Sequence, residues 1–148
     1  MIRPVYFCGS VLLLAACGRI AEKRNAVTDA IESAQAQEFC FQDITGNDSL
    51  LVQLTIVGND VTGTLRWLPA EKDKMVGTLN GILQNDTITA VYSYQAEGVN
   101  AREEKIFRLT TDSLFLAHGE LVDQNGTWVL KDKRTARFTE AAGKTDCK

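Results

Sequence analysis

The chain has 148 residues, with 16 basic and 19 acidic side chains, a net charge of −3 and 45% hydrophobic residues. Lysine and arginine are scattered among acids along the chain, and no basic patch of the kind that nucleic-acid binding requires is visible. The charge pattern is that of an ordinary soluble surface, so nucleic acid is a poor candidate partner.

The first 16 residues predict a secretory signal peptide. Arg3 supplies a positive charge, and an apolar run follows from Val5 to Ala16. The run is too short for a transmembrane helix, which needs about 20 apolar residues. It ends in Leu14-Ala15-Ala16-Cys17, which resembles the bacterial lipobox, a motif whose cysteine is lipidated and becomes the new N-terminus.

The lipobox resemblance implies a lipid anchor on Cys17, made of a diacylglycerol and an N-acyl chain such as palmitate. Each buried methylene contributes about 0.8 kcal/mol, so two or three chains anchor stably. Gly18 is not the aspartate that retains many such proteins in the inner membrane. We therefore expect an outer-membrane lipoprotein of the cell envelope, facing the periplasm or the surface. An uncleaved amphipathic helix and an ordinary signal peptide cut after Ala16 are the alternatives.

Four cysteines are present, and two of them remain for a disulfide. Cys8 leaves with the signal peptide and Cys17 carries lipid, so Cys40 and Cys147 should pair in an oxidising compartment. Closing a loop of about 108 residues would stabilise the fold by roughly 4.7 kcal/mol in the loop-entropy model. The alternative is unpaired or metal-bound thiols, although two cysteines without histidine partners make a poor zinc site.

Residues 17–37 predict a lipidated N-terminus and tether, because they are alanine-rich and polar with no buried face. From Glu38 onward, β-branched and aromatic residues alternate with polar ones, and short turns recur. Residues 38–148 therefore predict one all-β domain whose neighbouring strands pair antiparallel. The stretch after residue 131 is polar except for Phe138. The expected strands are 38–42, 50–57, 61–67, 75–83, 87–95, 102–109, 114–122 and 127–131.

We expect these strands to form a single up-and-down barrel of about eight strands. Apolar residues recur on one side of each strand, and glycines on the same side permit the coiling that closes a sheet. A disulfide from Cys147 to Cys40 would bring the last segment against the first strand, as barrel closure requires. An open β-sandwich with bulges at the glycines is the alternative. These glycines are Gly63, Gly77, Gly81 and Gly119.

The runs Val61–Leu65, Gly77–Gly81 and Asp86–Tyr94 resemble those of small lipoproteins of Bacteroidetes-type bacteria. The resemblance implies a compact lipocalin-like barrel and brings no catalytic residue. Three Asp-Ser/Thr-apolar triplets also resemble the acceptor of protein O-glycosylation in that group, although such dipeptides are common turn chemistry as well. The acceptor residues would be Ser49, Thr87 and Ser113.

Candidate ligand-binding residues follow from the alternation. Trp67, Tyr92 and Tyr94 are expected on the inward face, where a barrel of this size either packs solidly or holds one small molecule. Arg102 and Glu104 follow the tyrosine strand, near Glu97, and are expected to line the barrel mouth, where polar groups orient a ligand. Core packing and a solvated charge cluster are the respective alternatives.

Enzyme signatures are missing from the sequence, and no cofactor, metal site or catalytic residue is predicted. His118 and Glu120 would share one face of an alternating strand, and a structural role is favoured over an acid/base pair. The run from Asp123 to Gly126 resembles the start of a calcium loop but lacks the later ligands, so it predicts a hairpin turn.

Two functions follow from these observations. The favoured one is a membrane-anchored binding module whose barrel takes a small apolar or amphipathic ligand. The alternative is a barrel with a solid core whose loops engage an envelope protein as an interaction or inhibitor module. An enzyme ranks third, and we expect a monomer.

Overall fold

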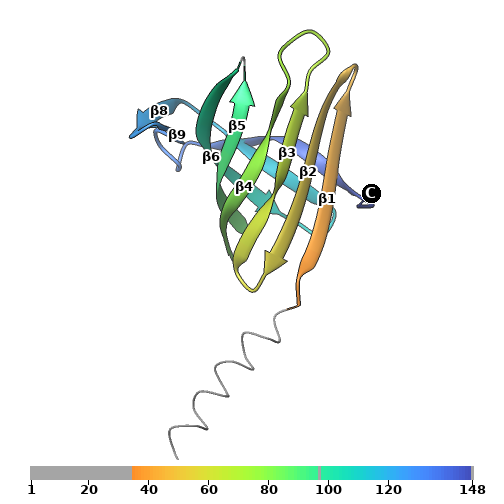
Figure 1. Ribbon diagram of the computed structural model, residues 1–148. Helices are drawn as coiled ribbons and strands as arrows, with labels where there is room; N and C mark the ends of the chain where they lie inside the picture. The colour runs from red at the N-terminus through yellow and green to blue at the C-terminus, as the bar shows by residue number, and fades with distance from the viewer. Residues whose placement is uncertain (1–34, 97, 148) are drawn as a thin grey trace, which may run out of the picture. The chain divides into compact units, whose positions relative to one another are not determined.

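The computed structural model describes residues 35–96 and 98–147 (Figure 1). The predicted signal peptide, Cys17 and most of the predicted tether lie outside these residues. No helix within the described ranges is long and apolar enough to span a membrane. The strands are β1 (Gln37–Thr45), β2 (Asp48–Val57), β3 (Asp60–Leu68), β4 (Met75–Gln84), β5 (Thr87–Ala96), β6 (Val99–Leu109), β7 (Ser113–His118), β8 (Leu121–Gln124), β9 (Thr127–Leu130) and β10 (Arg137–Thr145).

Strands β1 to β7 and β10 close into a barrel (Figure 1). β1 to β7 pair antiparallel in chain order. β10 then lies between β7 and β1, antiparallel to both. Because each of the eight strands has two neighbours, the ring has no free edge. The expected up-and-down barrel of eight strands is confirmed, and the open sandwich is excluded.

Two strand predictions were wrong. The expected strand 114–122 ends at His118, and Gly119 and Glu120 separate β7 from β8. The last segment, predicted without a strand, forms β10. Its pairing with β7 is shifted by an irregularity between Phe138 and Glu140. This shift breaks the period of two, so the sequence of β10 does not show the alternation that marks the other strands.

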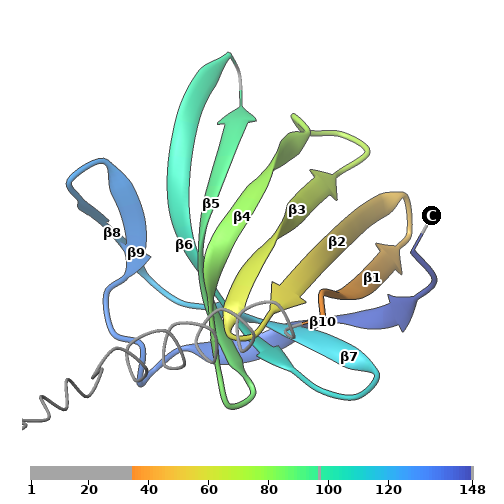
Figure 2. The ribbon, with the colours of Figure 1, turned by 60° about the horizontal axis from the view of Figure 1, so that its bottom comes forward.

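β8 and β9 form a hairpin to one side of the ring (Figure 2). The hairpin joins the barrel through one parallel residue pair, Glu103 of β6 with Trp128 of β9. Its turn has positive φ angles at Asn125 (55°) and Gly126 (79°), as a two-residue hairpin turn requires. The Gly126 N–H donates to Asp123 Oδ1 at 2.9 Å. The expected hairpin turn is confirmed.

The barrel core follows from the period-two alternation of β2 to β5. Residues that alternate along these strands are buried, and their neighbours in sequence are exposed or partly exposed. The residues of the core cluster are Phe41, Leu50, Val52, Leu54, Ile56, Val61, Leu65, Leu79, Ile88, Ala90, Tyr92, Phe107, Leu114, Leu116 and Ala142.

Glycines of β3 and β4 face the interior where neighbouring strands approach closely. A Cβ at Gly77 would overlap the carbonyl oxygen of Ser93, and one at Gly63 would overlap that of Gln53. The tight curvature predicted for these positions is therefore present in β3 and β4. Gly119, in contrast, lies after the end of β7 rather than within a strand.

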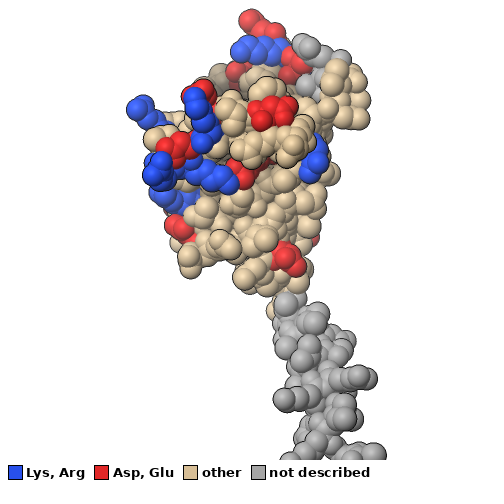
Figure 3. Space-filling view, turned by 90° about the vertical axis from the view of Figure 1, so that its left-hand side faces the viewer, with Lys and Arg blue, Asp and Glu red and all other residues tan. Residues whose placement is uncertain are grey.

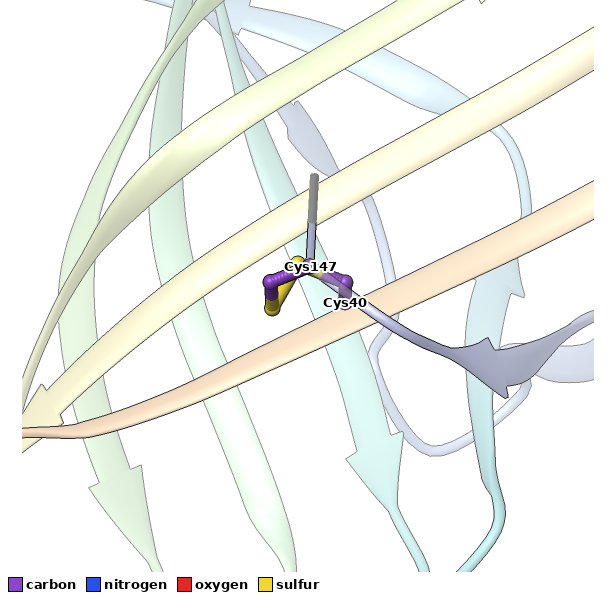
Figure 4. The surroundings of a disulfide bond; sticks show 2 residues. All are labelled: Cys40 and Cys147. Carbon is purple, nitrogen blue, oxygen red and sulfur yellow. A yellow bond between two sulfur atoms is a disulfide. The ribbon is translucent and has the colours of Figure 1, made fainter.

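The predicted disulfide joins Cys40 of β1 to Cys147, beyond the end of β10 (Figure 4). The Cα atoms are 5.2 Å apart, and 107 positions separate the two residues in the sequence. Between these strands the sheet register contains only the pairs from Cys40 with Thr145 to Gln42 with Gly143. The bridge therefore reinforces a short seam of the barrel.

Candidate binding site at the upper end of the barrel

The two ends of the barrel interior differ in polarity. We call the end with the β1–β2 turn and the β3–β4 loop the upper end, as drawn in Figure 1. The lower interior is filled by apolar side chains with at most 1% exposure, including Leu54, Val61 and Ile88. Several polar side chains enter the interior toward the upper end, as the register of β1, β6 and β10 shows below.

Glu103 and Lys105 point into the barrel from β6. Glu103 pairs with Tyr92 and Lys105 pairs with Ala90, and both partners are core residues. Since paired residues on antiparallel strands share a face, the two charged side chains lie on the inner face. Lys105 Nζ lies 2.7 Å from Glu103 Oε1. Only 15% of the Glu103 side chain and 21% of the Lys105 side chain is exposed. The interior therefore contains a partly buried ion pair.

Arg102 and Glu104 lie on the outer face of β6, in contrast to the prediction that they line the barrel mouth. Arg102 pairs with Ser93 and Glu104 pairs with Val91, residues that alternate with the inward tyrosines. Glu104 Oε2 receives the Lys133 ammonium at 2.7 Å. Lysine and arginine side chains gather on the upper half of the surface in Figure 3. Glu104 itself is largely covered, because its side chain is only 14% exposed and its Oε1 is buried without a hydrogen-bond partner among the described residues.

Tyr92 and Tyr94 lie on the inner face as predicted, with ring centroids 4.6 Å apart and planes within 15°. The Tyr92 hydroxyl donates to the Leu65 carbonyl oxygen at 3.1 Å. Gly77 pairs with Leu65 on one side and Tyr94 on the other, and it has no side chain that could block the hydrogen bond from Tyr92 to Leu65. Burial raises the pKa of Tyr92 far above its ordinary 10.0, with smaller contributions from Tyr94 and Glu103. Tyr92 is therefore a packed core residue.

A pocket of about 360 Å³ opens at the upper end, between the ends of β1, β2, β3 and β10. Trp67 and Leu50 supply apolar surface, and they form a cross-strand pair. Asp43 is opposite Leu50 on β1 and so shares the inner face. The lining residues are Asp43, Thr45, Asp48, Ser49, Leu50, Trp67, Thr139, Glu140 and Ala141. Trp67 is the predicted ligand-binding residue that the structure places here.

The two aspartates of the pocket, Asp43 and Asp48, have few hydrogen-bond partners. Asp43 Oδ2 accepts a long hydrogen bond of 3.3 Å from the Thr45 hydroxyl. Asp48 Oδ1 accepts the Ala70 N–H at 2.9 Å, which ties the β3–β4 loop to β2. Neither aspartate makes a salt bridge within the described residues. The pocket therefore combines an apolar wall with acidic groups that have spare hydrogen-bonding capacity.

His118 pairs with Glu140 and not with Glu120, which was expected on the same face of the strand. Its Nε2 is 2.9 Å from Glu140 Oε2. Glu120 follows the end of β7 and instead pairs with Lys131 at 2.9 Å. The shared face proposed for His118 and Glu120 is absent because Gly119 and Glu120 leave the strand. His118 thus contacts the rim of the pocket through a residue of β10.

Other candidates lie elsewhere. A second pocket of about 350 Å³ lies near the disulfide on β1 to β3, and it is lined by Leu51, Gln53 and Arg66 among others. Ser49, Thr87 and Ser113 lie at or next to the first residues of β2, β5 and β7, where turns enter strands, as expected. Within residues 35–96 and 98–147, no group of three or more acidic, histidine or cysteine residues has the geometry of a metal site.

Comparisons with known protein families, with curated proteins and with solved structures find no match to this chain. The case for a site therefore depends on the geometry of the barrel itself.

The sequence analysis missed Asp43 and Glu140. Asp43 continues the period of two from Phe39 and Phe41, and this alternation was the signal that could have placed it inside the barrel. Glu140 had no such signal, because the strand that carries it was not predicted.

Proposed function

We propose that this protein is a non-enzymatic binding module whose barrel takes one small amphipathic ligand at its upper end. The observation that supports this most directly is the pocket of about 360 Å³ in which Trp67 and Leu50 lie beside polar and acidic groups. Small-molecule sites typically combine apolar walls with a few polar groups that orient the ligand.

The filled lower interior limits the size of the ligand. Leu54, Phe107 and Leu114 have no exposed surface, so the lower half offers no space for a long acyl chain. The ion pair of Glu103 and Lys105 lies above this core on β6. A molecule about the size of one aromatic ring with a short polar arm fits a barrel that is filled below and open above better than a lipid does.

We also propose that the binding domain is a monomer tethered to the outer membrane through lipid on Cys17. This part of the proposal is supported by the lipobox-like run Leu14–Cys17. Metabolic labelling with a palmitate analogue, compared between the natural chain and Cys17→Ser, tests the anchor. Loss of labelling in the variant is the expected result, and equal labelling would contradict it.

An interaction module is the second candidate, favoured by exposed apolar residues around the β8–β9 hairpin. Trp128 is 45% exposed, and Leu121 is also exposed. Aromatic side chains of this kind are enriched at protein interfaces.

Non-denaturing mass spectrometry on the gently purified full chain distinguishes the two candidates. The proposed function predicts a defined extra mass that is lost on denaturation and is reduced in a Trp67→Ala variant. A Trp128→Ala variant serves as the matched control and should retain the adduct. A bare chain, even after incubation with an extract of envelope small molecules, contradicts the binding module.

A further inference from the structure

We infer that the pocket at the upper end binds a small organic cation with an ammonium or guanidinium group. This inference rests on the proposed function and specifies the chemistry of its ligand. Asp43, Asp48 and Glu140 line the pocket, and the described lining contains neither lysine nor arginine. A positively charged group is the ligand chemistry that complements such a lining.

The apolar wall of the pocket favours an organic cation over a metal ion. Trp67 contributes an aromatic side chain and Leu50 an aliphatic one. A cation over a tryptophan ring is attracted by the negative face of the ring, and this attraction increases when the cation is desolvated. Leu50 is only 4% exposed, so Trp67 supplies most of the apolar contact for the carbon skeleton of an organic cation, whereas a hydrated metal ion gains nothing from such a contact.

Two basic side chains near the upper interior, Lys105 and His118, already have acidic partners. Lys105 is paired with Glu103 at 2.7 Å. His118 contacts Glu140 through one oxygen, Oε2. Asp43 accepts only the 3.3 Å bond from Thr45 among the described residues. A ligand ammonium would therefore supply the charge-assisted hydrogen bond that Asp43 lacks, and a second one to Glu140.

The volume of the pocket restricts the cation to a small one. About 360 Å³ is near the lower limit of typical small-molecule sites. An aromatic ring carrying a short aminoalkyl chain has dimensions of this order, which makes 2-phenylethylamine a suitable probe. Its neutral analogue 2-phenylethanol and its anionic analogue 3-phenylpropanoate have similar shapes and different charges.

Isothermal titration of the full chain with these three probes at neutral pH tests the inference. We expect the amine to bind at least about tenfold more tightly than the alcohol, because a hydrogen bond to a charged group is stronger than a neutral one. The carboxylate should not bind measurably. Asp43→Asn and Glu140→Gln should each reduce amine affinity about tenfold and reduce alcohol affinity by a smaller factor. Asp60→Asn, an exposed acid of the lower end, is the matched control.

Equal binding of amine and alcohol, or tighter binding of the carboxylate, would overturn the cation inference while supporting the proposed function. Calcium that displaces the amine and loses affinity in Asp43→Asn would likewise overturn it. Failure of all three probes, together with a bare chain in the mass spectrometer, would reject both proposals. Circular dichroism of each variant establishes that it is folded, and the two single substitutions provide independent tests.

Discussion

The Glu103 carboxylate lies 2.7 Å from the Lys105 ammonium on the inner face of β6. The two residues are two positions apart on one strand, and their pair lies above side chains such as Phe107 that have no exposed surface. Charged groups in a barrel interior are costly unless they are paired. This pair therefore marks the level at which the apolar core gives way to the polar upper interior.

Lys105→Met should reduce the free energy of unfolding by about 1 to 3 kcal/mol, because it leaves the Glu103 charge without a partner in a partly buried position. Urea unfolding measures the change. Adding Glu103→Gln to the same chain should restore most of the loss, since both charges are then removed. If the double variant is as unstable as Lys105→Met alone, the loss of stability does not come from the unpaired Glu103 charge.

Removal of the disulfide should lower the free energy of unfolding more than Lys105→Met does. Cys40→Ser combined with Cys147→Ser should lower the free energy of unfolding by about 2 to 4 kcal/mol, because the bridge restrains the unfolded chain. Unfolding of the natural chain with and without a dithiol reductant provides a second measurement of the same quantity. If reduction changes neither the midpoint nor the slope, the bridge has no stabilising role.

Gly77→Ala should be strongly destabilising, by about 2 kcal/mol or more, because its Cβ would overlap the backbone carbonyl of Ser93. Gly143→Ala is the matched control. Its nearest heavy atom would be 3.9 Å away, at the Gln42 carbonyl oxygen, so a change within about 0.5 kcal/mol is expected. Thermal unfolding compares the two. Similar losses at both positions would contradict the close approach of β4 and β5.

Tyr92 gives the fold a dependence on alkaline pH. Its pKa is raised in the folded chain above the ordinary 10.0, chiefly by burial. The folded state therefore retains a proton that the unfolded state loses, and the associated stability is complete below about pH 10 and declines as the pH rises further. Tyr92→Phe should reduce stability by about 1 kcal/mol at neutral pH through loss of the hydrogen bond to Leu65.

The same variant tests the sign of the pH dependence. Between pH 9 and the highest pH at which unfolding remains reversible, the natural chain should lose more stability than Tyr92→Phe. Parallel stability curves for the two chains would show that Tyr92 does not have a raised pKa in the folded state.

The fold was largely predictable where alternation is strong. β2 to β5 place apolar residues or glycine at every second position, and the structure buries or partly buries those residues. β10 escaped prediction because its inward positions include Glu140 and Ala142, which do not form an apolar pattern. Its place is imposed by the two strands that it joins, β7 and β1.

The site was less predictable, and β6 shows why. Residues 102–105 are Arg-Glu-Glu-Lys, so nothing in their polarity indicates which residues face inward. The face is set by the pairing of Glu103 with Tyr92 across a hairpin. A shift of one residue would exchange the two sets of side chains, and the alternation that continues to Phe107 and Leu109 was the signal that could have fixed this register.

The central claim is that a small molecule binds at the upper pocket, and the two tryptophans of the chain allow a direct test. Trp67 lines the pocket, and Trp128 lies on the hairpin proposed for the interaction module. We would record fluorescence of Trp128→Phe and Trp67→Phe while adding an extract of envelope small molecules. A saturable change confined to Trp67 is the predicted result. No change at Trp67, with or without a response at Trp128, would contradict the claim.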